Sequence, residues 1–329
     1  MNYVELFAGA GGLSLGFEKA GFKNIFSVEY DPLIAKTYRL NFPKNKLICE
    51  DIKKITNDEI RNLVEDSKVD VIIGGPPCQG FSMAGRVGRS FIDDERNFLF
   101  KEFVRFVSVV RPKIFIMENV SRLAIHNKGK TINEIVSEFE KLGYQVQYKV
   151  LQSAEYNVPQ KRQRIFVVGT RNLEFSFPTG KRNFISVSEA IGDLPKLKSG
   201  EKSNVPNHIA MNHSNQMLEK MSFIPDGGDR NSIPVEIRPK SGDSRKYIRY
   251  NSKLPSVTVT GDMRKIFHYN QNRALTNREL ARLQSFPDNF VFVGNSISIQ
   301  QQIGNAVPPN LSYAIAKEVR KSIDRNGAD

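Results

Sequence analysis

The chain has 329 residues, which is enough for one large domain or two smaller ones with a substantial hydrophobic core. Hydrophobic residues make up 40% and charged residues 25%, a balance that excludes an intrinsically disordered chain. No apolar run approaches the roughly 20 residues of a membrane-spanning helix, and no signal-peptide pattern precedes the first predicted strand. The two cysteines exclude a disulfide scaffold and suit a reducing cytoplasm, where we expect the protein.

The net charge of +13 suits a polyanionic partner such as nucleic acid, although a solvated basic surface would give the same total. Residues 171–272 contain 16 basic and 10 acidic residues, together with seven of the sixteen prolines. We therefore expect a basic and irregular module in this part of the chain. The four histidines lack the spacing of zinc ligands, so we expect no metal site.

The first half of the chain alternates short apolar runs with amphipathic stretches, a pattern typical of β-α units. Asp31 before Pro32 predicts a helix start, and Thr56 with Glu59 predicts a capping box. The alternation predicts an α/β fold with a mostly parallel sheet covered by helices on both faces. The predicted strands are 4–7, 25–28, 47–49, 69–73, 114–117, 145–151 and 165–168, and the predicted helices include 97–110 and 132–142.

This regular pattern stops between about residues 175 and 272, where proline, glycine, asparagine and serine are frequent. Residues 253–260 are the clearest predicted strand of this region. Helical periodicity returns at 276–285 and 311–323. We therefore expect an α/β domain that is interrupted by the basic module and completed by the C-terminal segment.

A glycine-rich loop, 7–12 (FAGAGG), lies between the first predicted strand and the first helix, where open α/β sheets bind ligands. The third glycine of the NAD fingerprint would fall at Ser14 and is missing. Glu29 and Asp51 follow the second and third strands, and the Glu29 carboxylate could accept hydrogen bonds from ribose hydroxyls. A plain tight turn is the alternative interpretation of the loop.

A second loop, 74–82 (GGPPCQGFS), follows the buried strand 69–73 and presents Cys78 at the carboxyl end of the sheet. A thiolate at that place is a candidate nucleophile, whereas a cysteine elsewhere is more often an inert core residue. Ser82 is the rival nucleophile, because residues 80–84 nearly match a hydrolase elbow and fail it only at the last position.

Charged side chains follow the next two strands. Glu118, in the ENV segment after 114–117, could hydrogen-bond or protonate a bound heterocycle, or it could be a turn or capping residue. Arg162 and Arg164 precede 165–168, and strand alternation predicts that they share one side of a strand. Either could contact an anionic or carbonyl oxygen, although an ordinary basic turn has the same pattern.

The order of these motifs decides between the interpretations. FAGAGG, GGPPCQGFS, ENV, QKRQR, RALTNREL with RLQSFPD, and GNAVPPN together resemble the DNA cytosine-5 methyltransferase family. The resemblance covers about 1–172 and 273–329 and skips the basic insert, where that family has its target-recognition domain. It implies a Rossmann-like catalytic domain, 1–173 with 273–329, that binds S-adenosylmethionine, and a target-recognition domain at 174–272.

The resemblance also implies roles for single residues. Cys78 would attack C6 of cytosine, Glu118 would hold and protonate the ring at N3, and Arg164, with Arg162 nearby, would contact O2 and the DNA backbone. Glu29 would bind the ribose, and Asp51 would bind the adenine. Tyr30 stands where relatives often have tryptophan and would pack on the adenine. The full set of implied cofactor-binding residues is Phe7, Ala10, Gly11, Gly12, Glu29, Tyr30, Asp51, Ile52, Pro76, Leu99, Asn305 and Ala306.

We therefore predict that the protein is a monomeric DNA (cytosine-5)-methyltransferase. It would flip its target base out of double-stranded DNA, as the bacterial enzymes of restriction-modification systems do. The resemblance is compatible with a cognate restriction endonuclease that acts on the same site. A tRNA cytosine-5 methyltransferase would use the same motifs, and a serine hydrolase or a non-enzymatic DNA-binding protein are the alternatives from other classes. No motif predicts the recognition sequence.

Overall fold

The structure is a computed structural model that describes residues 1–65, 67–77, 98–239 and 246–325. The chain packs into two compact units. The first comprises Met1–Gln152, Gln163–Thr179 and Leu311–Asp329, and the second comprises Ser153–Arg162 and Gly180–Asn310. The two units reflect which residues pack together. They do not test whether residues 174–272 recognise the target, so the predicted target-recognition domain stays a prediction.

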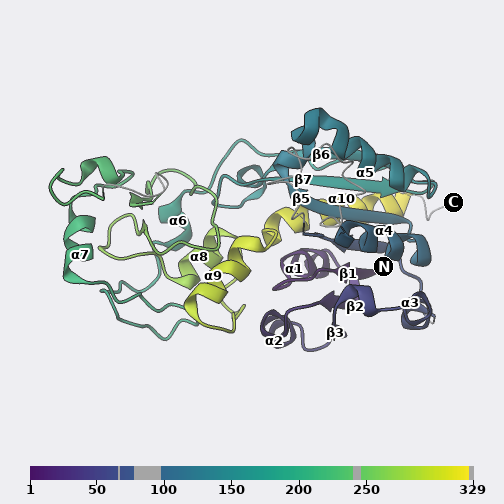
Figure 1. The fold of residues 1–329 in the computed structure, drawn as a ribbon, viewed down its shortest axis with the longest axis horizontal. Helices are drawn as coiled ribbons and strands as arrows, with labels where there is room; N and C mark the ends of the chain where they lie inside the picture. Colours follow the sequence, from purple (N-terminus) through teal and green to yellow (C-terminus); the bar gives the residue numbers. More distant parts are fainter. Residues whose placement is uncertain (66, 78–97, 240–245, 326–329) are drawn as a thin grey trace. The chain divides into compact units, whose positions relative to one another are not determined.

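Within the described residues, the first unit is built on a seven-stranded sheet with the order β3-β2-β1-β4-β5-β7-β6 (Figure 1). All neighbouring strands are parallel except β7, which runs antiparallel to β5 and β6. The mostly parallel sheet is therefore confirmed. The strands are β1 (Asn2–Leu6), β2 (Lys23–Glu29), β3 (Leu47–Cys49), β4 (Val71–Gly74), β5 (Ile114–Val120), β6 (Gln145–Gln152) and β7 (Gln163–Thr170).

Helices cover both faces of this sheet. On one face, phenylalanines of α4 and α5 pack with Phe115 and Val167 in the main hydrophobic core. On the other face, Tyr3 of β1 contacts Phe17 of α1, and α10 lies against α1 (Figure 1). The helices are α1 (Gly12–Lys19), α2 (Pro32–Asn41), α3 (Asn57–Val64), α4 (Phe98–Val110), α5 (Lys130–Glu140) and α10 (Pro309–Arg325), with short 3-10 turns at η1 (Ile52–Lys54) and η5 (Ser121–Gly129).

The predicted helix starts are confirmed. Asp31 accepts hydrogen bonds from the backbone amides of Leu33 and Ile34, with Pro32 at the first helical position. Thr56 and Glu59 form a complete capping box at the start of α3.

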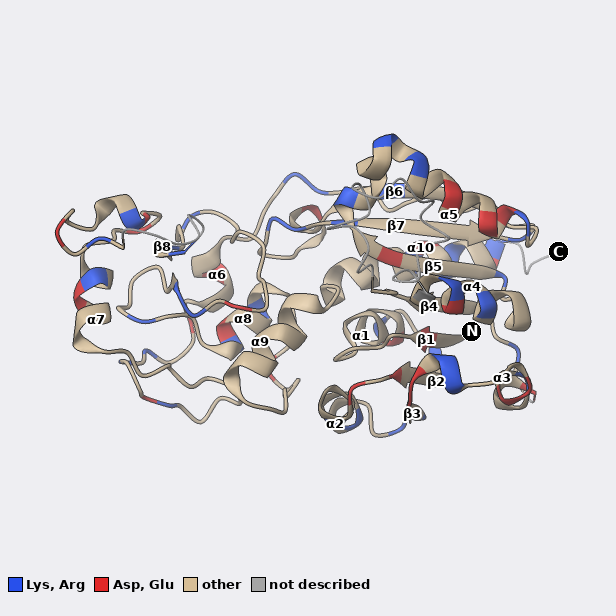
Figure 2. Ribbon diagram, viewed as in Figure 1, with Lys and Arg blue, Asp and Glu red and all other residues tan. Residues whose placement is uncertain are grey.

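The second unit has little regular structure, as predicted. Its elements are η6 (Ser153–Tyr156), α6 (Val187–Ile191), α7 (Asn215–Ser222), η7 (Arg230–Ser232), β8 (Ile248–Arg249), β9 (Ile266–Phe267), α8 (Asn277–Leu283) and α9 (Ser296–Asn305). Its lysines and arginines lie on loops as well as on α7 (Figure 2). No helix in the described parts of either unit has the length and hydrophobicity needed to cross a bilayer.

The predicted strand at 253–260 is wrong. The segment makes one isolated bridge, between Ser256 and Gln160. The Val259 amide donates to the side chain of Gln160 (2.8 Å), and the Val259 carbonyl accepts from the Arg162 guanidinium (3.0 Å). Side chains thus take the hydrogen bonds that a neighbouring strand would otherwise supply, so the apolar alternation is present without a ladder.

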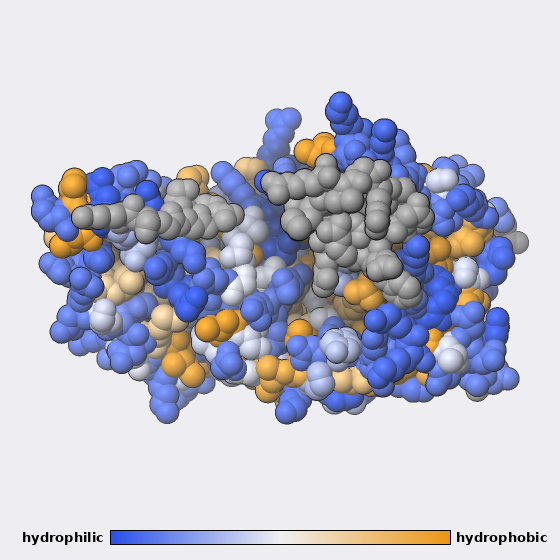
Figure 3. All heavy atoms as spheres, viewed as in Figure 1, coloured by the Kyte–Doolittle hydropathy of each residue, from blue (hydrophilic) through white to orange (hydrophobic). Residues whose placement is uncertain are grey.

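A buried arginine connects several loops of this unit. The Arg249 guanidinium, 4% exposed, donates to the carbonyl oxygens of Met221, Ile224, His268 and Gln271 at 2.6–2.8 Å. One side chain therefore satisfies backbone acceptors from two separate stretches of the chain, 221–224 and 268–271. On the face drawn in Figure 3, hydrophobic residues are interspersed with hydrophilic ones.

A carboxyl group is buried in the first unit. Glu5 of β1 is 1% exposed, and its carboxylate accepts a hydrogen bond from the Ser14 hydroxyl of α1. Burial raises the pKa of Glu5 to about 8. The side chain is therefore protonated at neutral pH in the folded protein and ionised in the unfolded chain.

This shift predicts a pH dependence of stability. Between pH 4.5 and about 8 the unfolded chain has released the Glu5 proton and the folded chain has not, so the free energy of unfolding falls as pH rises. Glu5→Gln removes this contribution. Its stability relative to the natural protein should rise by about 3 kcal/mol between pH 5 and pH 8, measured by urea unfolding at both values. A difference that is independent of pH would contradict a raised pKa.

Candidate functional site

The predicted ligand loops begin at one edge of the sheet. Leu6 pairs with Gly74, and Gly74 pairs with Met117, so the glycine loop and the GGPP loop leave neighbouring parallel strands at their carboxyl ends, and the ENV segment forms the end of β5 next to them. This edge is where open α/β sheets bind ligands.

The glycine loop turns sharply between β1 and α1. Gly9 and Gly11 have φ values of 57° and 96°, in the left-handed region that favours glycine. A Cβ atom on Gly11 would lie 2.3 Å from the Phe42 ring, whereas one on Gly9 would meet no atom within 4 Å. Phe7, at φ 58°, is half-buried, Ala10 is buried, and Gly12 begins α1. The space beside Gly9 can accept a ligand close to the backbone.

Glu29 closes this loop from the end of β2. Its Oε2 accepts a hydrogen bond from the Gly9 amide (2.7 Å), and its Oε1 accepts one from the Asp31 amide (2.9 Å). Burial raises the pKa of this carboxyl, while the two amide donors act in the opposite direction. Glu29 therefore links the glycine loop to the start of α2, a role that the sequence did not reveal.

The ends of β2 and β3 bring an aromatic ring and a second carboxylate to the same edge. Tyr30 is 71% exposed, and Cys49 at the end of β3 points its thiol toward the Tyr30 carbonyl oxygen (4.0 Å). Asp51 accepts a hydrogen bond from the Lys53 amide (3.1 Å), and the adjacent Ile52 is buried. An exposed aromatic ring can stack on a flat heterocycle, and a carboxylate can accept a hydrogen bond from it.

A charged pair lies at the edge formed by β5 and β7. Arg164 and Glu118 form an ion pair, with Nε 2.8 Å from Oε1, and both side chains are largely buried, at 15% and 10% exposure. In the antiparallel pairing Arg164 lies opposite Val120, which makes Arg164 and Glu118 diagonal neighbours on one face. The guanidinium can therefore orient the carboxyl group.

The GGPP loop packs directly against this pair. A Cβ atom on Gly75 would lie 2.9 Å from Glu118 Oε2, so glycine allows the close approach. The Asn119 side chain donates to the carbonyl oxygen of Pro76 (3.1 Å), which is buried. The sequence analysis assigned a role to Glu118 of the ENV segment but did not predict this hydrogen bond between Asn119 and Pro76. Cys78 and Ser82 lie outside the described residues, and Leu99 is half-buried near the start of α4.

The expectation that Arg162 and Arg164 share one side of a strand is wrong. β7 begins at Gln163, and Arg162 belongs to the second unit, where it is 1% exposed. Its guanidinium donates to the carbonyl oxygens of Gly304 (2.6 Å) and Ala306 (3.3 Å). Strand alternation does not apply across the boundary of a strand, and a substrate contact by Arg162 remains a prediction.

The GNAVPPN motif, with Asn305 and Ala306, ends α9 in the second unit. Gln160, which received no role from the sequence, is fully buried and donates to the Leu283 carbonyl (3.2 Å) and to the Gln284 side chain (2.9 Å). Gln284 in turn donates to the carbonyl oxygens of Ile303 (2.7 Å) and Ala306 (3.4 Å). Buried glutamines therefore join the QKRQR, RLQSFPD and GNAVPPN motifs.

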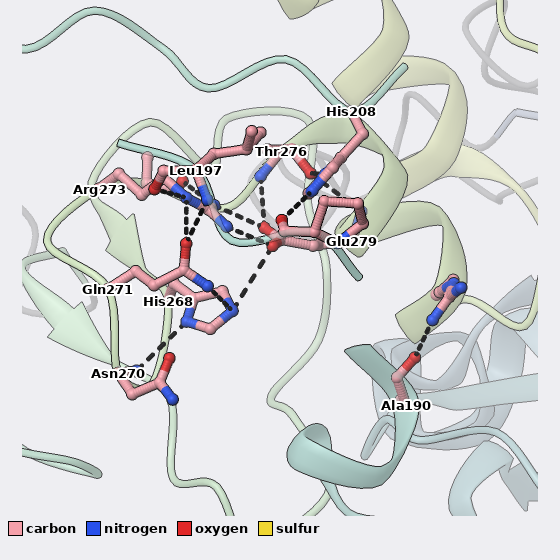
Figure 4. A network of polar contacts seen from close by, with 12 residues as sticks. Ala190, Leu197, His208, His268, Asn270, Gln271, Arg273, Thr276 and Glu279 are labelled. Carbon is pink, nitrogen blue, oxygen red and sulfur yellow. Dashed lines mark hydrogen bonds and ion pairs between the residues drawn. The ribbon is translucent and has the colours of Figure 1, made fainter. Parts of the chain in front are cut away.

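The RALTNREL motif forms a buried ionic cluster (Figure 4). Arg273 donates to both carboxylate oxygens of Glu279, at 2.8 and 2.6 Å, and neither side chain exceeds 1% exposure. Burial alone would raise the pKa of Glu279, but the Arg273 bonds outweigh it and lower that pKa. Burial also lowers the pKa of the adjacent His268 to about 4, so this imidazole is neutral at pH 7.

Comparison with known proteins identifies the family. The family model for C-5 cytosine-specific DNA methylase matches residues 1–321. The chain is 58% identical over 323 residues to the type II methyltransferase M1.HphI of Haemophilus parahaemolyticus, covering 98% of this chain and 87% of that protein. The chain belongs to the C-5 cytosine-specific DNA methylase family. It is a DNA (cytosine-5)-methyltransferase, which sets aside the hydrolase and non-enzymatic alternatives.

Other relatives agree. The type II methyltransferase M.NgoFVII of Neisseria gonorrhoeae is 35% identical, with 96% of this chain and 85% of that protein covered. A prophage-encoded DNA modification methyltransferase from Escherichia coli has a solved structure with a TM-score of 0.81 and 26% identity, covering 98% of this chain and 99% of that one. The methyltransferase EhMeth of Entamoeba histolytica shares the fold, with a TM-score of 0.68 at 17% identity and 98% of each chain covered.

The ionic cluster predicts the effect of one substitution. Glu279→Ala leaves the buried Arg273 without its carboxylate, and the second unit should lose about 3–5 kcal/mol of stability in urea unfolding. Glu189→Ala is a matched control, because Glu189 occupies the same position of a capping box on α6 but is exposed. It should cost about 1 kcal/mol. Equal losses in the two variants would mean that the capping box, and not the ion pair, stabilises this unit.

Proposed function

We propose that this methyltransferase flips a cytosine out of a short duplex sequence and methylates C5 through a covalent bond between Cys78 and C6. The observation that carries the proposal is the Glu118–Arg164 pair, which lies against the loop that leads to Cys78. Both groups are held at the edge where the predicted cofactor loop also begins. The C5 and C6 atoms are inaccessible inside a duplex, so the base must leave the stack.

The cofactor pocket is proposed at the glycine loop. The open space beside Gly9, the exposed Tyr30 ring and the Glu29 carboxylate fit a ribose and an adenine. Asp51 and Ile52 would border the adenine. S-adenosylmethionine, the donor that the family implies, supplies an electrophilic methyl group when bound.

The chemistry assigned to the protein begins at Cys78. Its thiolate forms a bond to C6, and the ring electrons move toward N3, where Glu118 as a carboxylic acid donates a proton. Arg164 orients Glu118 and can donate to the cytosine O2. C5 then becomes the nucleophile that receives the methyl group. A base removes the C5 hydrogen, the thiolate leaves as the C5–C6 double bond re-forms, and N3 returns its proton to the Glu118 carboxylate.

We further propose that residues 174–272 read the target sequence and that the enzyme protects DNA in a restriction-modification system. Names of type II methyltransferases among the relatives support this role. The lysines and arginines of the segment support contact with phosphates, because they release counterions from DNA. A cognate endonuclease and action as a monomer are part of the same proposal.

The cofactor assignment predicts the effect of Glu29→Ala. The change removes the acceptor for the ribose hydroxyls and releases the Gly9 amide, at a cost of about 1–3 kcal/mol for each unpaired group. The Kd for S-adenosylmethionine should rise at least about tenfold in calorimetry, with the Kd for DNA little changed. Glu59→Ala, which removes an exposed carboxylate from α3, should leave both constants unchanged. An unaltered cofactor Kd in Glu29→Ala would remove Glu29 from the site.

The covalent step predicts a trapped complex. Fluorine at C5 cannot leave as a cation, so duplex DNA with 5-fluorocytosine at the target should form a denaturant-stable adduct that requires S-adenosylmethionine. Cys78→Ser should abolish the adduct, because a hydroxyl is a far weaker nucleophile at neutral pH, while cofactor binding persists. Cys49→Ser is the control and should still form it. An adduct that maps to Cys49, or trapping on tRNA in preference to DNA, would overturn the proposal.

A further inference from the structure

Ser14 stands where a dinucleotide-binding fingerprint would have its third glycine, and the structure gives it a different task. The side chain is fully buried on α1. Its hydroxyl donates to Glu5 Oε2, accepts from the Tyr3 hydroxyl (2.8 Å) and lies 2.8 Å from the Tyr38 hydroxyl. Three hydrogen-bonding partners therefore surround one serine, which lies two residues after the end of the glycine loop.

The contacts continue into the neighbouring elements. The Tyr38 hydroxyl, on α2, lies 2.8 Å from the Ser27 hydroxyl of β2. The Asn45 side chain donates to Tyr38 (3.2 Å) and to Glu18 of α1 (2.6 Å). The network therefore connects α1 to β1, β2 and α2. A fully bonded buried network of this kind holds its members in one arrangement.

The opposite side of α1 is fixed by α10. The Ser312 hydroxyl donates to the Leu13 carbonyl oxygen (2.8 Å), and a Cβ atom on Gly16 would lie 2.3 Å from Ser312 Oγ. Gly16 is thus the glycine that allows α1 to pack closely against α10. Position 14 is free to carry a hydroxyl toward the sheet.

We propose that Ser14 is a positioning residue for the cofactor loop. The inference rests on the proposed binding of S-adenosylmethionine at residues 7–12. Gly9 and Gly11 have no side chains to restrain the loop, so its conformation depends on the hydrogen bond between Glu29 and the Gly9 amide and on where its two ends are held. β1 holds one end, and the Ser14 hydroxyl holds the other by fixing the first turn of α1. Loss of the hydroxyl lets this turn shift, and the loop amides no longer meet the ligand in the binding geometry.

The test compares two buried serines of the first unit. Ser14→Ala removes the central hydroxyl of the network. Ser322→Ala removes a hydroxyl of α10 that donates to the Glu174 carbonyl oxygen. The Kd for S-adenosylmethionine is measured by calorimetry, KM and kcat by methyl transfer to DNA, and Tm by thermal unfolding. Ser14→Ala should raise the Kd and KM for the cofactor about tenfold with kcat within about twofold, whereas Ser322→Ala should lower Tm and leave the Kd unchanged.

Tyr38→Phe is the second variant and decides the matter if Ser14→Ala does not fold. It removes a partner of Ser14 from α2 and leaves β1 and α1 untouched, so the cofactor Kd should rise by a smaller factor. A Kd for Ser14→Ala or Tyr38→Phe equal to that of the natural protein overturns the inference, as does an equal rise in Ser322→Ala. If the natural protein itself fails to bind S-adenosylmethionine, the proposed function fails instead.

Discussion

Every buried backbone amide and carbonyl group must find a hydrogen-bonding partner, and the two units meet this constraint in different ways. In the first unit the parallel strands β1 to β5 pair with one another, and the ladders supply the partners. In the second unit, where regular structure is sparse, buried polar side chains take over. Arg162, Arg249 and Arg278 each donate to two or more backbone carbonyl oxygens.

This difference has a consequence for function. Bonds within a ladder fix a strand relative to its neighbours, so the carboxyl edge of the first unit can hold Glu29 and Glu118 at defined places. In a loop that is held by a few guanidinium groups, the other side chains need not alternate between two faces as they do in a strand. Such loops can change in sequence with little effect on the fold, which suits a segment proposed to read DNA.

The proposed chemistry also depends on this separation of tasks. Glu118 and Arg164 come from adjacent antiparallel strands, and their diagonal contact follows from the register of β5 and β7. The GGPP loop reaches them because Gly75 has no side chain to block the approach. The net charge of +13 favours association with DNA whatever its sequence. Positioning of the reacting groups thus depends on a few residues at the sheet edge, whereas attraction of the substrate depends on the net charge of the whole chain.

The sequence by itself determined the fold class, the strands of the sheet, the helix starts at Asp31 and Thr56, and the family, because periodicity, capping and motif order are present in the sequence itself and do not depend on which segments meet in space. The tertiary structure decided the rest. Whether 253–260 forms a strand depends on its neighbours, and the side chains of Gln160 and Arg162 took the bonds of Val259. The buried place of Arg162 and the hydrogen-bonding role of Ser14 likewise depend on residues distant in sequence, which no local pattern encodes.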